Sequence, residues 1–228
     1  LDTTFKNSIP RLNLQYTFSP DLMVYATWSK GVNPGTFNTI LATETQARNF
    51  ALYAANGIGL VVKPEKLTNY EIGAKGRFWE GRGTFALAAY QAQWRDQIIQ
   101  VPIQVYLNTA STVLDFTQRP SQNSGNTDLR GIELDATLAA TEQLSFRLSA
   151  AFNDSEIKTY SCPVFCQAII GASNQVAPKG NHLPVTPRYN GLAAGQYTAP
   201  LAGDWRWYLS GEYVFAGPMF ADITNVVK

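Results

Sequence analysis

The stretch that decides the fold spans residues 130–152 and reads RGIELDATLAATEQLSFRLSAAF. Every second residue in each half is apolar, and most of the residues between them are polar or charged. In the first half, for example, Ile132 and Leu134 flank Glu133, and in the second half Phe146 and Leu148 flank Arg147. A period of two places alternate side chains on opposite faces of a β-strand. Because the break between the halves is short, the stretch predicts a hairpin with one apolar face and one charged face.

The same alternation recurs along the chain and predicts an all-β fold of eight strands, arranged as four hairpins. Besides 130–138 and 144–152, clear strands are predicted at residues 11–18, 69–78 and 205–215, and less regular ones at 22–30, 84–101 and 188–198. In 84–101 the apolar set changes phase near Tyr90, which predicts a β-bulge there. The segment 188–198 is rich in Gly and Ala, so its register stays open.

The connections are of two kinds. Tight turns rich in Pro, Gly and Asp are predicted at 19–21, 80–83, 141–143 and 201–204, and long loops at 31–66, 105–127 and 161–186. Short turns at one end and long loops at the other are typical of outer-membrane β-barrels, whose loops face outside. Residues 83–104 could form one strand, longer than the ~9–11 residues that cross a bilayer, so we expect strands that project beyond the membrane.

Aromatic residues gather at both ends of the predicted strands, as in the interface girdles of such barrels. Those near the tight turns are Tyr16, Phe18, Phe78, Trp79, Phe146, Trp205 and Trp207; those near the loops are Trp28, Tyr70, Trp94, Phe152, Tyr189 and Phe215. Any one strand would also fit a soluble β-sandwich. Long strands, one-sided turns and two aromatic belts together favour an antiparallel, up-and-down transmembrane barrel.

Composition narrows the classes of function. The net charge of +1 gives no electrostatic case for binding nucleic acid. No apolar stretch reaches the 18 or so residues of a membrane-spanning helix, so the chain is either soluble or crosses a membrane as strands. The N-terminus lacks the pattern of a signal peptide, and we expect both ends to be cuts inside a longer protein.

The two cysteines, Cys162 and Cys166, lie four residues apart. Two thiols alone cannot complete a structural metal site. Their spacing is typical of a small disulfide loop in an oxidising compartment, although two free thiols remain the alternative. No set of side chains forms a nucleophile, base or metal cluster, and the single histidine, His182, is expected to be an ordinary loop residue. The sequence therefore predicts neither an enzyme nor a cofactor.

Several segments resemble the barrel of TonB-dependent receptors, in that family's order. They are YATWSKGVNPGTFN (25–38), PEKLTNYEIGAKG (64–76), AYQAQWRDQI (89–98), NTDLRGIELD (126–135) and PRY (187–189). The resemblance covers nearly the whole chain, 1–228. It implies a barrel of about 22 strands with an N-terminal plug, of which this chain holds a part without the plug. Eight strands from a wider cylinder should form an open, curved sheet with two unpaired edges.

The resemblance also implies location in the bacterial outer membrane, in contact with its lipid, and active uptake of a scarce nutrient such as a siderophore, vitamin or glycan. The small-molecule ligand would be, for example, a ferric siderophore, and a plug outside this chain would contact the TonB complex. Two alternatives stay open. One is a passive porin or structural outer-membrane barrel; the other is a soluble all-β carbohydrate-binding module.

Two groups of candidate residues follow. The charged faces of the predicted strands would point into the lumen, where water, each other or the plug can solvate them; they carry Glu71, Lys75, Arg77, Glu133, Asp135, Arg147, Arg206 and Glu212. Ligand capture, if the family resemblance holds, belongs to the loops, where the candidates are Asn33, Phe37, Tyr53, Arg119 and Asn123.

Overall fold

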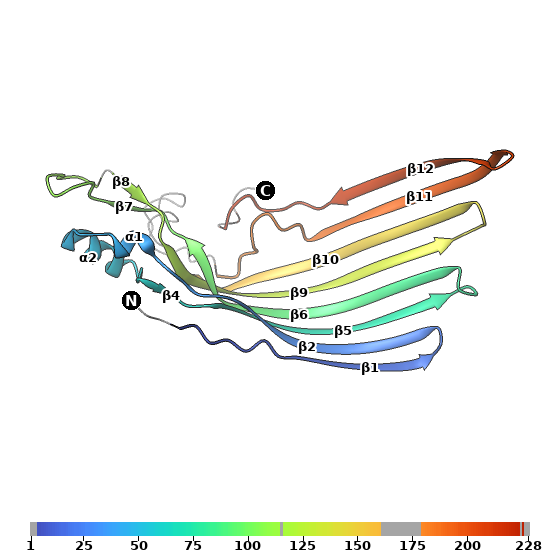
Figure 1. Cartoon of the computed structure of the whole chain (residues 1–228), viewed down its shortest axis with the longest axis horizontal. Helices are drawn as coiled ribbons and strands as arrows, with labels where there is room; N and C mark the ends of the chain where they lie inside the picture. The colour runs from blue at the N-terminus through green and yellow to red at the C-terminus, as the bar shows by residue number, and fades with distance from the viewer. Residues whose placement is uncertain (1–3, 115, 161–178, 224, 226–228) are drawn as a thin grey trace.

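The computed structural model describes residues 4–114, 116–160, 179–223 and 225. Its main element is an eight-stranded antiparallel sheet in which the strands lie side by side in chain order (Figure 1). The strands are β1 (Arg11–Ser19), β2 (Leu22–Asn33), β5 (Glu65–Phe78), β6 (Gly83–Gln100), β9 (Ser121–Ala139), β10 (Leu144–Tyr160), β11 (Tyr189–Ala202) and β12 (Trp205–Ala216). The predicted up-and-down arrangement of four hairpins is confirmed.

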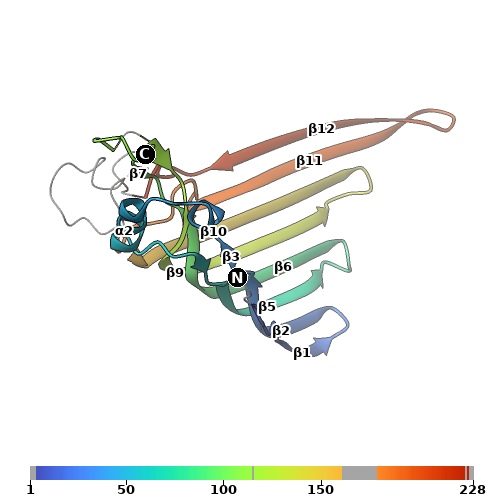
Figure 2. The ribbon, with the colours of Figure 1, turned by 60° about the vertical axis from the view of Figure 1, so that its left-hand side comes forward.

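The sheet does not close on itself. Among the described strands, β1 and β12 stand at opposite ends of the order and do not pair with each other (Figure 2). The prediction of an open sheet with two free edges is therefore confirmed.

The two ends of the sheet differ as predicted. Four tight turns lie at one end, and the described parts of the long connections lie at the other (Figure 1). The turn between β5 and β6 needs positive φ angles at three consecutive residues: Trp79 (54°), Glu80 (57°) and Gly81 (82°). Glycine accepts such an angle without strain, so Gly81 adds no backbone cost at its own position in this turn.

The long connections hold more structure than loop-like sequence suggested. The first carries β3 (Thr36–Phe37), α1 (Thr39–Ala42), α2 (Ala47–Ala55) and β4 (Val61–Val62), and the second carries β7 (Ile103–Val105) and β8 (Phe116–Gln118). The third falls mostly outside the described residues, and the predicted Cys162–Cys166 disulfide falls there too. None of the helices in the described residues is long and apolar enough to cross a membrane.

The register separates the sheet into two faces. One row across seven strands is apolar and reads Leu14, Ala26, Ile72, Ala89, Ile132, Phe152 and Tyr189. The next row points to the opposite side and is mostly polar; it reads Asn13, Thr27, Glu71, Tyr90, Gly131 and Asn153. We call these sides the apolar face and the polar face.

No described element covers the apolar face. Leu14 is 63% exposed, Ile72 is 64% exposed and Ile132 is 53% exposed. A soluble sheet must bury such a face against a second layer, because a patch this large would drive aggregation in water. Hydrocarbon is the solvent that suits it.

The aromatic residues predicted near the loops lie on the apolar face, with one exception. Trp28 lies directly opposite Tyr70, and Phe152 opposite Tyr189, on the loop side of the apolar face. The prediction for Trp94 is wrong, because Trp94 pairs with Leu67 and shares the polar face with Tyr90. The sequence pattern failed here because Trp94 lies past the point where the apolar residues of this strand change sides.

The bulge predicted near Tyr90 is also wrong. The β5–β6 register is continuous from Phe78 opposite Gly83 to Lys66 opposite Arg95, and the β6–β9 register shifts only between Trp94 and Ile98. The phase change has another cause: Tyr90 belongs to the polar face, where its hydroxyl donates to Asn153 Oδ1 at 2.7 Å.

Strand lengths differ from the predicted ones at the loop end. β9 begins at Ser121, so the predicted loop 105–127 is shorter than expected. β10 extends to Tyr160, beyond the predicted end at residue 152. β6 ends at Gln100, two residues before Pro102. The added ends of β9 and β10 place the charged residues Asp128, Asp154 and Glu156 on the side that continues the apolar face, where Asp154 pairs with Arg130 at 2.7 Å. Beyond the hydrocarbon no face needs to be apolar, so the alternation that marks a strand disappears there.

Candidate functional site on the polar face and the loop cap

The polar face is held together by hydrogen bonds between neighbouring strands. The Tyr25 hydroxyl donates to Glu71 Oε1 at 2.7 Å, and the Thr27 hydroxyl donates to Asn13 Oδ1 at 2.7 Å. The Ser149 hydroxyl donates to Asp135 Oδ1, also at 2.7 Å. These bonds link adjacent strands near the middle of the sheet, and two of them orient the carboxylates of Glu71 and Asp135.

Tyr25 and Tyr90 fit on this face because glycines lie beside them. A Cβ added to Gly73 would lie 2.5 Å from the Tyr25 ring, and one added to Gly131 would lie 2.7 Å from the Tyr90 ring and 2.6 Å from the Phe152 carbonyl oxygen. Large rings laid over glycines fill the missing side-chain volume and pin the register of the sheet.

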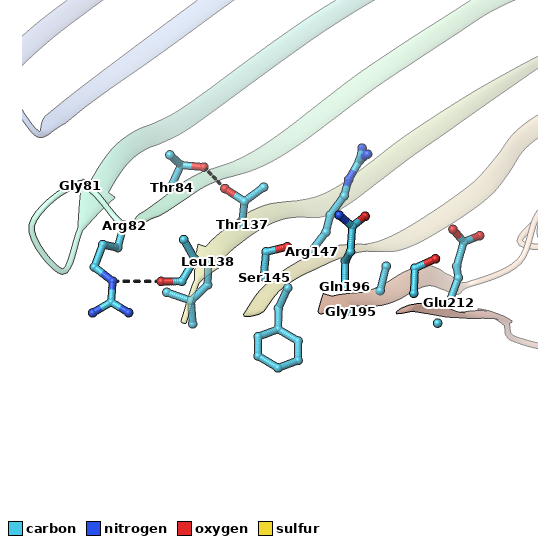
Figure 3. A pocket seen from close by; sticks show the side chains of 15 residues that line it. Gly81, Arg82, Thr84, Thr137, Leu138, Ser145, Arg147, Gly195, Gln196 and Glu212 are labelled. Carbon is cyan, nitrogen blue, oxygen red and sulfur yellow. Dashed lines mark hydrogen bonds between the residues drawn. The ribbon is translucent and has the colours of Figure 1, made fainter. Parts of the chain in front are cut away.

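A row of the polar face toward the tight turns carries three of the charged residues predicted for the lumen. It reads Arg77, Thr84, Thr137, Arg147, Ala194 and Glu212 across six strands. Arg77 is paired with Asp21 of the β1–β2 turn at 3.0 Å. Arg147 and Glu212 line a hollow of about 720 Å³ together with Arg82, small residues such as Ser145 and Gly195, and the apolar Leu138 and Phe146. Figure 3 shows Arg147, Gln196 and Glu212 pointing to the same side of their strands, and Thr84 bonded to Thr137.

The other predicted lumen residues share this face by register. Lys75 lies between Met23 and Ala86, with its ammonium 5.5 Å from the Tyr25 ring centroid. Glu133 lies between Ala88 and Ala151, and Arg206 lies opposite Pro200. The eight residues therefore form several rows of one face rather than a single cluster.

The described parts of the first two long connections pack into one body, which we call the loop cap (residues 34–64, 101–114 and 116–120). Its apolar core consists of Leu41, Tyr53, Ile58, Ile103 and Val105. The side chain of Asn49, 1% exposed, accepts from the Tyr106 N–H and donates to the Tyr106 carbonyl, both at 3.0 Å. The Arg48 guanidinium lies 3.8 Å from the Tyr106 ring centroid.

Two further asparagines fasten the loop cap to the sheet. Asn38 accepts from the Ser121 N–H at 2.7 Å and donates to the Ser121 carbonyl at 2.8 Å. Asn123 makes the same exchange with the backbone of Lys63, accepting at 2.7 Å and donating at 2.8 Å. Paired backbone bonds from one amide hold a loop much as a strand partner would.

Glu44 and Tyr53 are the residues of the loop cap whose pKa values are shifted. Burial by itself would raise the pKa of the Glu44 carboxyl, but hydrogen bonds from the Gln46 N–H, the Asn49 amide and the Thr45 N–H outweigh it and lower that pKa below 4.5. Burial, and then the Glu44 carboxylate, raise the pKa of the Tyr53 hydroxyl above 10.0.

The five predicted ligand residues do not meet at one place. Tyr53 is fully buried in the loop cap, and Asn123 is occupied with backbone bonds. Phe37 lies 6.0 Å from the Phe5 ring, and Arg119 is exposed. Asn33 alone among the five lines a pocket of about 620 Å³ on the polar face, where its amide donates to Glu65 Oε2 at 2.8 Å. His182, expected to be an ordinary loop residue, is held by the Ser155 carbonyl and by Arg188.

Pocket-lining Leu67, Trp94 and Leu129 were missed by the sequence reasoning. Strand parity was the signal that could have found them. Counting by twos from Glu71 leads to Leu67, and counting by twos from Glu133 leads to Leu129, so both belong to the charged face.

Comparison with known proteins identifies relatives of this arrangement. All of residues 1–228 match the family described as "TonB dependent receptor-like, beta-barrel". The ferric yersiniabactin uptake receptor FyuA from Yersinia pestis aligns with 96% of the chain at 19% identity and a TM-score of 0.63. BauA, the ferric preacinetobactin receptor from Acinetobacter baumannii, aligns with 96% at 16% identity and a TM-score of 0.63.

A third solved structure, the siderophore receptor PiuA from Acinetobacter baumannii, aligns with 95% of the chain at 12% identity and a TM-score of 0.62. The chain spans 27% of the length of each of these three receptors. At these identities the likeness establishes the fold of the sheet and not the ligand.

Proposed function

Because this chain belongs to the TonB-dependent receptor family, whose β-barrel it matches over residues 1–228, we propose that it forms part of the wall of an outer-membrane receptor for active nutrient uptake. In this proposal the apolar face contacts outer-membrane lipid and the polar face lines the lumen. The tight turns face the periplasm, and the loop cap faces the outside of the bacterium.

The uncovered apolar face is the observation that carries the proposal. Its residues are more than half exposed at Leu14, Ile72 and Ile132, which only a hydrocarbon solvent makes favourable. The same observation, together with the family match, supports a membrane-spanning wall over a soluble carbohydrate-binding module.

The free edges of β1 and β12 support a wider barrel. An unpaired edge cannot face lipid, since its N–H and C=O groups would have no partners. We therefore propose that further strands and a plug, outside this chain, complete a barrel of about 22 strands. The plug would pack against the polar face and contact the TonB complex.

A ferric siderophore is the nutrient we propose. The three structural relatives are receptors for ferric yersiniabactin, for ferric preacinetobactin and, in the third case, for a siderophore. The pocket of about 620 Å³ on the polar face and the loop cap lie at the loop end of the sheet, which such a ligand would reach first.

The test is uptake by bacteria that express the intact receptor containing this chain. We expect uptake of ⁵⁵Fe bound to one of a panel of siderophores, lost when the tonB gene is deleted or the proton gradient is collapsed. Uptake that persists without TonB would favour a passive porin. Absence of uptake across siderophores, with uptake of a vitamin or glycan, would reject the iron ligand and keep the transport function.

A further inference from the structure

An apolar island interrupts the polar face just below the loop cap. It consists of Leu67, Ala92, Trp94 and Leu129, which belong to β5, β6 and β9. Register places Leu67 directly opposite Trp94, and Ala92 directly opposite Leu129. These side chains line the pocket of about 620 Å³, within the size range of small-molecule sites.

The apolar island is more exposed to solvent than residues that serve only to pack a core. Leu67 is 39% exposed and Trp94 and Leu129 are half-buried, although Ala92 is 7% exposed, whereas the nearby core of the loop cap buries Ile103 to 4% and Val105 to 1%. Apolar surface left open on a face that is otherwise polar is unfavourable in water and usually marks a binding surface.

Gly31 keeps the pocket open. It lies opposite Leu67 on β2 and lines the same pocket. A Cβ added there would lie 3.8 Å from Leu67 Cβ, an ordinary contact, and the backbone of Gly31 is not in the left-handed region. The backbone would therefore accept a side chain at 31, and that side chain would fill the space above Leu67.

The charges around the pocket are negative. Glu65, Glu71 and Glu133 line it. Glu65 accepts from the Asn33 amide and from the Ile98 N–H, and Glu71 accepts from the Tyr25 hydroxyl. Lys66, the one basic residue of the lining, alternates to the other face of β5. An anionic group placed here would face carboxylates without a matching cation, which is unfavourable.

We propose that this pocket binds an uncharged aromatic ring of the transported ligand, stacked against Trp94 between Leu67 and Leu129. The proposal rests on the uptake function proposed above and adds the chemistry of the group that is recognised. Stacking and burial of one ring contribute enough that losing Trp94 should weaken the contact roughly fivefold to tenfold.

Photolabelling of the intact receptor in lipid vesicles tests this proposal. The probes are 4-(hydroxymethyl)benzophenone, which is uncharged, and 4-benzoylbenzoate, which carries the same rings with a carboxylate. After irradiation, mass spectrometry locates the labelled peptides. We expect the uncharged probe to label the segments around 67 and 94, and the carboxylate to label them at least about fivefold less.

Three variants sharpen the test. Trp94→Ala and Gly31→Leu should each reduce this labelling about fivefold or more, and Trp94→Phe should retain most of it. Trp28→Ala, on the apolar face, is the matched control and should leave the labelling unchanged. Gly31→Leu keeps the test informative if Trp94→Ala fails to fold.

Three results would overturn the proposal: equal labelling by both probes, labelling unaffected by Gly31→Leu, or labelling that forms only after the plug is deleted. The last would show that the plug occupies the pocket. Siderophore uptake by the same receptor is measured separately. Uptake without labelling rejects the pocket alone, and labelling without any uptake rejects the transport function alone.

Discussion

Arginine at position 134 should destabilise the intact receptor far more than arginine at position 133. Leu134 lies on the apolar face between Leu87 and Ala150, whereas Glu133 lies on the polar face between Ala88 and Ala151. The two positions are adjacent in one strand, so strand propensity and turn chemistry are the same for both. Only the solvent that each side chain meets is different.

The magnitude follows from the depth of Leu134. On β10, Phe146 and Phe152 mark the two aromatic layers, six residues apart, or about 20 Å along the strand. Leu134 pairs with Ala150, about 7 Å inward of Phe152 along the strand, so it lies well inside the apolar band. An arginine facing lipid at this depth costs about 2–4 kcal/mol, or roughly 30-fold to 800-fold in the unfolding equilibrium.

Guanidinium-induced unfolding in lipid vesicles, followed by tryptophan fluorescence, measures this difference. We expect Leu134→Arg to lower the free energy of unfolding by about 2–4 kcal/mol and Glu133→Arg to lower it by less than about 1 kcal/mol. Leu134→Gln separates loss of the leucine from gain of the charge. Equal destabilisation by the two arginines would refute the assignment of the faces.

Three further outcomes are expected. Gly131→Ala should destabilise the sheet by about 1–3 kcal/mol in the same assay, because its Cβ would meet the Phe152 carbonyl and the Tyr90 ring, whereas Gly211→Ala, with nothing within 4 Å, should change little; similar values for the two would contradict the packing described. Asn49→Ala should speed proteolysis of the loop cap at least about tenfold, because it leaves the Tyr106 backbone groups unpaired inside a buried site; unchanged cleavage rates would count against the loop cap as one body. Acid should destabilise the loop cap. Because the pKa of Glu44 is lowered in the folded state, the stabilisation that its carboxylate provides is complete above the ordinary pKa of 4.5 and is lost as the pH falls through the lower folded-state pKa. Hydrogen exchange in α2 should therefore rise below that pH in the wild type, and it should rise less in Glu44→Gln.

Within the membrane-spanning part, most of the fold follows from the sequence. Ile132, Leu134 and Leu138 alternate with charged or polar residues because each face of a strand meets one solvent only. That constraint is local, and it also places Glu71, Lys75 and Arg147 on the polar face without any knowledge of partners. The tight turns are local too: Pro, Gly or Asp residues fix the backbone in three of them, and in the fourth the Thr141 hydroxyl accepts from the Gln143 and Leu144 N–H groups.

Outside the hydrocarbon the sequence was a poorer guide. Ser121–Leu129 forms the start of β9 although it shows no alternation, because water on both sides removes the demand for an apolar face. Tyr53 could not be recognised as the centre of the loop cap, since the residues that bury it, Ile103 and Val105, are about 50 positions away. No local pattern in the sequence indicates that burial, and Tyr53 was therefore predicted to be a ligand residue.

The class of fold, the two faces, the four hairpins and the end of the sheet that carries the loops can be predicted from residue order, because they depend on period and turn chemistry within a few residues. The folded chain was needed to show that Trp94 and Leu67 share a pocket, that Gly31 leaves it open and that two loops form one cap. Those facts depend on pairing between segments that are distant in the chain, where register and packing set which side chains meet.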